Sequence, residues 1–142
     1  MTRLTKALLT AAIAMLLAPG SVAAASEGWE AMRRPGAIAL MRHAYAPGTG
    51  DPAAFRLGDC STQRNLNDEG REQARRIGAA FRANGIAVDR VLSSQWCRSS
   101  ETADLLALGE VEELPSLNSF FDARDRREDQ TRATIGFLRG QP

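Results

Sequence analysis

The stretch that decides the fold is Ala37-Ile38-Ala39-Leu40-Met41-Arg42-His43, a short apolar run that ends in an arginine and the only histidine of the sequence. Turn-forming pairs bound it, Pro35-Gly36 before and Pro47-Gly48 after. Such a run is typical of a buried strand, and strands buried on both faces are typical of parallel α/β sheets. Ligands bind just past the carboxyl ends of these strands. We therefore expect a buried strand over 37–42, with Arg42 and His43 at a ligand site.

Beyond this run, segments with helical and strand patterns alternate. Asn67 or Asp68 can cap a helix whose Ala74, Ile77 and Phe81 recur at spacings of three and four residues. The expected elements are a strand at 37–42, a helix from 67 or 68 to 84, a strand at 86–93, a helix at 96–108, an edge strand at 110–114 and a helix at 125–139. This order predicts an α/β fold with a parallel sheet and right-handed crossovers. Three strands are few for such a domain, so we expect a small sheet or a fold that is incomplete at the C-terminus.

The first 25 residues have the layout of a secretory signal peptide. Arg3 and Lys6 form a basic region, an apolar region follows to Ala18, and small residues up to Ala25 offer a cleavage site. A membrane anchor is the alternative, although the apolar run is short for a bilayer. We expect residues 26–142 to form one domain that is periplasmic or secreted, without a membrane attachment after cleavage.

Charge and cysteine content narrow the classes of function. Removal of residues 1–25 leaves sixteen basic and seventeen acidic residues, a formal charge of −1. This balance argues against a protein that binds nucleic acid. Cys60 and Cys97 can pair in an exported protein, and the sequence leaves the disulfide and the free thiols equally open. One histidine and two distant cysteines do not have the spacing of a zinc site, and we expect no metal.

Arg42, His43 and Arg98 stand at two predicted strand ends and would form a compact cationic pocket. Guanidinium groups present planar forks of donors that match phosphate oxygens, and nearby cations favour the neutral imidazole. A neutral imidazole nitrogen can attack phosphorus while the arginines stabilise the charge that develops on its oxygens. The pattern indicates phosphoryl transfer without a required metal or cofactor. The alternative is a partly buried histidine among arginines that pair with local carboxylates.

Three segments carry a resemblance to a known family. They are Met41-Arg42-His43-Ala44, the block from Leu66-Asn67-Asp68-Glu69-Gly70 to Gln73-Ala74, and the block from Ser93-Ser94 through Arg98 to Thr102-Ala103. In this order they resemble the signatures of the histidine phosphatase superfamily, whose fold is the phosphoglycerate-mutase-like three-layer arrangement with a parallel sheet. The resemblance covers about residues 37–107. Together with the signal peptide, Ala44 makes the chain more similar to a small exported bacterial branch than to a glycolytic mutase.

The resemblance implies a phosphatase that hydrolyses phosphate esters. His43 would be the phosphorylated nucleophile, and Arg42 and Arg98 would bind the phosphate. The family has a second histidine late in the chain, which this sequence does not contain. We therefore expect the C-terminal part of the fold to be absent. The acid of the family is a carboxylate in the loop after the third strand, where Asp122 is the nearest candidate and Asp125 the next.

The loop over 44–65 should overhang His43 and select the substrate, a small phosphate ester or a phosphorylated molecule. Gln63 and Arg64 are the candidate substrate contacts there, with Arg56 as a third. An ordinary solvated loop is the alternative for all three, and it is the better explanation for Arg56. Two other readings of the chain stay open. One is a non-catalytic periplasmic module that binds phosphate esters, and the other is a structural remnant with neither role.

Overall fold

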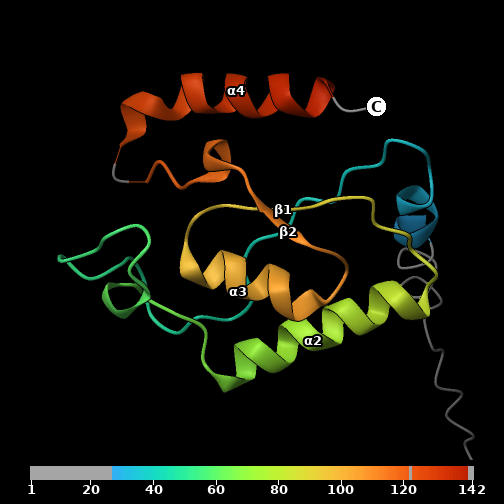
Figure 1. Ribbon diagram of the computed structural model, residues 1–142, viewed down its shortest axis with the longest axis horizontal. Coiled ribbons are helices and arrows are strands. Elements are labelled where there is room, and N and C mark those ends of the chain that lie inside the picture. Colours follow the sequence, from blue (N-terminus) through green and yellow to red (C-terminus); the bar gives the residue numbers. More distant parts are fainter. Residues whose placement is uncertain (1–26, 122, 141–142) are drawn as a thin grey trace, which may run out of the picture.

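The computed structural model describes residues 27–121 and 123–140, in which short strands alternate with helices (Figure 1). A short helix over 27–32 comes first. The later elements are η1 (Cys60–Thr62), α2 (Asp68–Ala83), β1 (Val91–Ser93), α3 (Cys97–Leu106), β2 (Val111–Glu113), η2 (Pro115–Leu117), η3 (Arg124–Arg126) and α4 (Arg127–Arg139). The α/β class predicted from the sequence is confirmed, and the arrangement is consistent with a phosphoglycerate-mutase-like fold.

The described sheet contains two strands, which run parallel. Val91 lies opposite Val111 and Ser93 opposite Glu113, and α3 forms the crossover between the strands. Figure 1 shows α4 on one side of this strand pair and α3 with α2 on the other. The carboxyl end of β1 leads within a few residues into the first turn of α3. Arg98 consequently lies next to the carboxyl end of the sheet, where the sequence predicts a ligand site.

Helix α2 forms where its sequence predicts it. The side chain of Asn67 accepts a hydrogen bond from the Gly70 N–H and caps the helix, and two acidic residues occupy the first turn. The helix packs closely on α3 at Gly78. A Cβ added at this position would lie 1.9 Å from the Leu106 carbonyl oxygen. Only glycine permits this approach of two backbones.

A small apolar core joins α2 to the segment after His43. Its buried members have less than a tenth of their surface exposed and are Ala44, Ala46, Leu66 and Ala74, with Leu105 packed against them. Alanine predominates, so the backbones lie close together here. The core consequently fixes the residues that directly follow His43.

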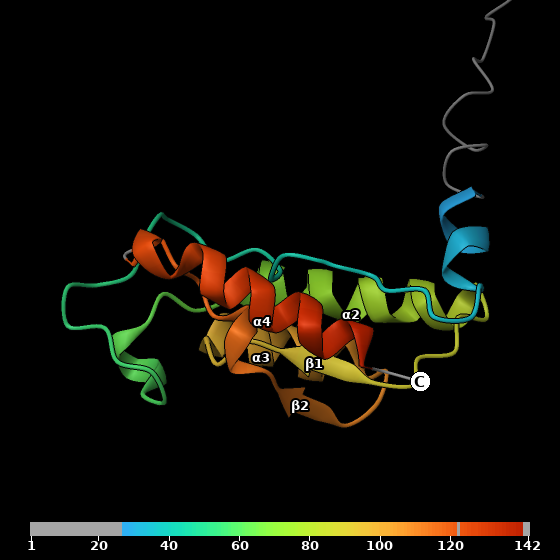
Figure 2. The same ribbon diagram turned by 90° about the horizontal axis from the view of Figure 1, so that it is seen from above.

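The predicted buried strand over 37–42 is wrong for the described part of the chain. The segment is extended but pairs with neither β1 nor β2, and Figure 2 draws it as coil. Ile38, Leu40 and Met41 have 56%, 79% and 47% of their surface exposed. A strand is buried on both faces only when neighbours cover it, and an apolar run by itself does not specify those neighbours.

The predicted signal peptide, residues 1–25, lies outside the described residues. Of the helices in the described segments, none is both long and apolar enough to cross a membrane.

Candidate active site

His43 is fixed by its neighbour Ala44. The buried Ala44 N–H donates to the Thr102 hydroxyl at 3.0 Å, and that hydroxyl donates to the Arg98 carbonyl at 2.6 Å. Thr102 on α3 therefore links the backbone just after His43 to the backbone of Arg98, the second predicted arginine. This contact explains why an Arg-x-x-x-Thr spacing suits the site, since the two residues are separated by one helical turn.

The imidazole of His43 is half-buried, and its Nδ1 lies 2.6 Å from the Ala44 carbonyl oxygen. Because a carbonyl oxygen only accepts, Nδ1 carries the proton in the neutral ring and Nε2 keeps its lone pair. Burial is the largest cause that lowers the pKa of His43 below its ordinary value of 6.5, and the Ala44 carbonyl opposes it. Positive charges lower this pKa further, and they come from Arg98, Arg42 and Arg64. The ring is therefore neutral near pH 7, with Nε2 able to act as a nucleophile.

Helix α2 holds the other side of the same loop. The Tyr45 N–H donates to the Gln73 side-chain oxygen at 2.7 Å. A Cβ at Gly70 would lie 1.9 Å from the Tyr45 carbonyl oxygen, so the loop passes directly over this glycine. The Gly-x-x-Gln spacing thus places a gap and a hydrogen-bond acceptor on one helix face, one turn apart.

Arg98 is 8% exposed and pairs with Asp51, a residue that sequence reasoning missed. Its Nη1 and Nη2 donate to the two carboxylate oxygens at 2.7 and 3.1 Å. The carboxylate also accepts from the Trp96 indole N–H at 3.1 Å and from the Arg64 N–H at 3.0 Å. Burial alone would raise the pKa of Asp51, but these donors together lower it below its ordinary value. Asp51 is therefore an ionised anchor between the loop and α3.

Arg64 and Arg42 differ in how they are held. The Arg64 guanidinium donates from Nε to the Gly50 carbonyl at 2.8 Å and from Nη1 to the Ala46 carbonyl at 2.5 Å. Burial and the charge of Arg98 lower the pKa of Arg64, so two cations lie close together. Arg42 is exposed. The three arginines that surround His43 therefore include two ordered ones and one that projects into solvent.

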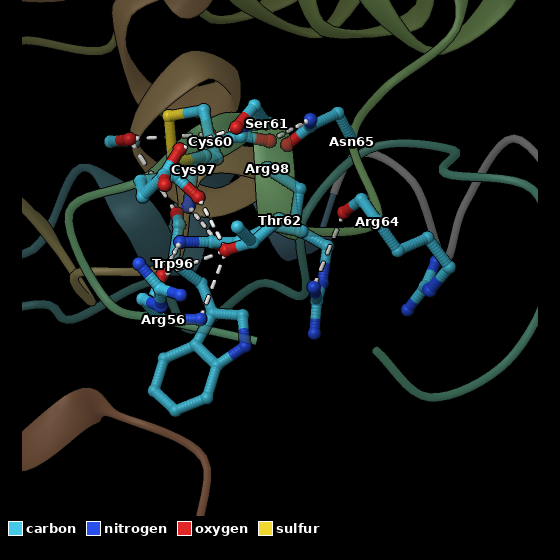
Figure 3. The surroundings of a disulfide bond; sticks show 12 residues. Arg56, Cys60, Ser61, Thr62, Arg64, Asn65, Trp96, Cys97 and Arg98 are labelled. Atoms are coloured by element: carbon cyan, nitrogen blue, oxygen red, sulfur yellow. Dashed lines mark hydrogen bonds between the residues drawn. A yellow bond between two sulfur atoms is a disulfide. The ribbon is translucent and has the colours of Figure 1, made fainter. Parts of the chain in front are cut away.

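Gln63 is buried, and both ends of its amide are occupied. Its oxygen accepts from the Cys97 N–H at 2.9 Å, which satisfies a donor of the first turn of α3, and its nitrogen donates to the Arg56 carbonyl at 3.0 Å. Cys97 is also joined to Cys60 in a disulfide, shown with the neighbouring Arg98 in Figure 3. The structure thus resolves the open question of pairing. It gives Gln63 a bridging position, while its predicted contact with substrate stays a prediction.

The candidate acids lie after β2. Asp122 lies outside the described residues, and Asp125 is exposed on η3. The loop that precedes Asp122 is tied to the start of α3, because Asn118 and Gln95 exchange two hydrogen bonds of 2.8 Å. This pair brings the loop to the same end of β1 as Arg98.

The residue types around His43 suit an anion better than a metal ion. Within 27–121 and 123–140, no three His, Cys, Asp or Glu side chains gather closely enough to hold a metal. Three guanidinium groups and one neutral imidazole instead provide donors and a nucleophile for a phosphate group.

Two residues of this arrangement, Asp51 and Trp96, are not among the site residues expected from the sequence. Asp51 stands before a proline in a glycine-rich loop, a context that resembles any turn. Trp96 stacks on Phe55 with ring centroids 5.0 Å apart and forms the N-terminal boundary of α3. The indole N–H of a partly buried tryptophan needs an acceptor, and this need is the one hint that the sequence offers for Trp96.

Comparison with known proteins shows what the chain is similar to. The profile described as "Histidine phosphatase superfamily (branch 1)" matches residues 38–132. The chain is also 38% identical over 56 residues to the "Serine/threonine-protein phosphatase Pgam5, mitochondrial" of Drosophila grimshawi, which covers 39% of this chain and 19% of that relative. The matched part is thus about a fifth of the relative's length. No solved structure matches the chain.

Proposed function

The chain belongs to the histidine phosphatase superfamily, and from this premise we propose that it hydrolyses phosphate monoesters through a phosphohistidine intermediate on His43. The observation that carries the proposal is the hydrogen bond between His43 Nδ1 and the Ala44 carbonyl, in a ring of lowered pKa. It supports a neutral imidazole with a free Nε2 lone pair beside three cations. That combination is what attack on a phosphate dianion requires.

The proposed reaction has two steps. In the first, Nε2 of His43 forms a bond to phosphorus, the bond from phosphorus to the ester oxygen breaks, and the leaving oxygen takes up a proton. In the second, water attacks phosphorus, the bond from nitrogen to phosphorus breaks, and inorganic phosphate leaves the neutral imidazole. Arg42 and Arg98 stabilise the charge on the phosphoryl oxygens in both steps. Asp122 is the proposed proton donor and Asp125 the second candidate.

The proposed substrates are small phosphate esters or phosphorylated side chains. The similarity to the serine/threonine-protein phosphatase of the fly favours a phosphoserine or phosphothreonine substrate. Gln63 and Arg64 are proposed to contact the substrate from the loop over 44–65. We further propose that the protein is exported into the periplasm or medium, which is supported by the disulfide, because such bonds persist in oxidising compartments.

Hydrolysis of an aryl phosphate tests the proposal. His43→Ala should lower kcat by roughly a thousandfold or more, because the nucleophile is lost. Arg98→Lys should lower kcat/KM by about a hundredfold, because a lysine cannot reproduce the planar fork. Arg132→Gln is the matched control, since this arginine is exposed on α4 and pairs with Asp129 only on the surface. Activity that survives His43→Ala would reject the nucleophile.

A phosphate-ester-binding module without turnover is the second candidate. The observation in its favour is the single histidine of the sequence, where the resembled family has two. Calorimetry with inorganic phosphate separates the candidates. Binding that depends on Arg98 together with no turnover of an aryl phosphate or a phosphoserine peptide would favour the module.

A further inference from the structure

We infer that Asp51 is the positioning residue of the phosphate site, and that it holds Arg98 end-on so that the Nε edge of the guanidinium faces the phosphate. The inference rests on the proposed function in one respect, the assignment of Arg98 to phosphate binding. Neither the family match nor the fly relative assigns a role to Asp51.

The contact with Asp51 uses one particular edge of Arg98. The carboxylate oxygens meet Nη1 at 2.7 Å and Nη2 at 3.1 Å, so Asp51 lies at the tip of the guanidinium. The remaining hydrogen of Nη1 points towards the Arg64 carbonyl, whose oxygen lies 3.3 Å away. This leaves the side edge, formed by Nε and the outer hydrogen of Nη2. A guanidinium can therefore keep its carboxylate partner and still offer a second two-donor edge.

One donor of that second edge, the Nε–H, has no acceptor among the described residues. Arg98 Nε is fully buried, and no group in the described segments accepts its hydrogen. An unsatisfied buried donor on a charged group costs free energy, and native proteins rarely keep one without a reason. A bound phosphate would satisfy Nε and the outer Nη2 hydrogen at once, in the bidentate geometry that phosphate and arginine favour.

Asp51 is itself held firmly enough to orient another group. Its side chain is 14% exposed, and besides Arg98 it accepts from the Trp96 indole and the Arg64 N–H. Trp96 is fixed in turn by stacking on Phe55. The negative charge of Asp51 also offsets one of the positive charges near His43. Arg98 and Arg64 can therefore lie close to each other before a phosphate binds.

The first test is phosphate affinity, measured by calorimetry with inorganic phosphate, and kcat/KM for an aryl phosphate. Asp51→Asn keeps the size of the side chain but removes the charged fork, and it should weaken both quantities about tenfold. Asp129→Asn is the matched control, because it breaks an exposed pair on α4, and it should change neither.

A double-mutant cycle separates positioning from simple structural support. If Asp51 acts through Arg98, adding Asp51→Asn to Arg98→Lys should change phosphate affinity by less than about twofold. Independent tenfold losses in both backgrounds would overturn the inference. So would an Asp51→Asn protein that binds phosphate as the wild type does.

A second measurement does not use Asp51→Asn, so it remains decisive if that variant does not fold. The Nε–H resonance of Arg98, identified by its loss in Arg98→Lys, should shift strongly when inorganic phosphate is added. An unchanged resonance at saturating phosphate would overturn the inference while leaving the proposed function intact. A wild-type protein that neither binds phosphate nor turns over esters would overturn both.

Discussion

Replacing Cys60 and Cys97 together with serine should lower the free energy of unfolding by about 4 kcal/mol. The two cysteines are separated by 37 residues, and the bond connects η1 in the loop to the first residue of α3. Closing a loop of that length removes conformational entropy from the unfolded chain, which is worth about 4 kcal/mol near 25 °C. For a domain of this size the same change should lower Tm by about 10 °C or more.

Urea denaturation of the oxidised wild type and the double serine variant measures this difference directly. Intrinsic fluorescence follows unfolding through Trp29 and Trp96, and Trp96 stacks on Phe55 beside the disulfide. A free energy of unfolding within about 1 kcal/mol of the wild type would refute the reasoning. It would mean that the hydrogen bonds of Gln63 and the ion pair between Asp51 and Arg98 hold the loop on α3 without the disulfide.

The same bond should affect phosphate binding, because Arg98 directly follows Cys97. Reduction of the wild type should raise KM for an aryl phosphate, since the loop that carries Asp51 is then less firmly attached to α3. The double serine variant is the internal control, as the sequence contains no other cysteine for the reductant to act on. A reductant that lowers the activity of both proteins equally would show that the disulfide is not its target.

Two further predictions concern packing and pH. Gly78→Ala should lower the free energy of unfolding by about 2 kcal/mol or more, because its Cβ would lie 1.9 Å from the Leu106 carbonyl oxygen. Gly136→Ala is its control in urea denaturation, since nothing lies within 4 Å of the new methyl group, and it should stabilise by about 0.5–1 kcal/mol. In the pH profile of kcat/KM, the acid limb should lie below pH 6.5, because the lowered pKa of His43 keeps the ring neutral to more acidic pH. Arg64→Gln removes one cause of that lowering and should move the acid limb upward; an unmoved limb would show that His43 does not limit the rate there.

The helices could be predicted because their signals are local. Asn67 caps α2 as its sequence indicates, and Gly70 was recognisable within a helix-start motif. The reason for that glycine was not recognisable, since the Tyr45 carbonyl that passes over it belongs to another part of the chain. The local pattern therefore identified Gly70, but its structural role became clear only from the contact with Tyr45.

The strand over 37–42 could not be predicted correctly because burial depends on partners. An apolar run such as Ile38 to Met41 indicates that these side chains favour burial, but it does not specify what buries them. In the described chain they are exposed. The parallel pairing of β1 and β2 was easier to predict, because two successive strands separated by a helix usually lie parallel in one sheet.

The sequence suggests candidate site residues where a residue acts by its own chemistry. His43, Arg42 and Arg98 were selected for nucleophilicity and charge, and burial together with the three arginines accounts for the lowered pKa of His43. Asp51 could not be predicted, because its importance comes entirely from a contact 47 residues away along the chain. Gln63 was selected as a polar loop residue, and the structure occupies both ends of its amide.

The central claim is that His43 is a covalent nucleophile, and trapping of the phosphorylated protein tests it most directly. The wild type, mixed rapidly with an aryl phosphate and quenched in alkali, should gain the mass of one phosphoryl group on the peptide that contains His43. His43→Ala should gain none, and the label should be lost in acid, as expected for a bond from nitrogen to phosphorus. Turnover without any label on His43, or a label of equal amount in His43→Ala, would contradict the account.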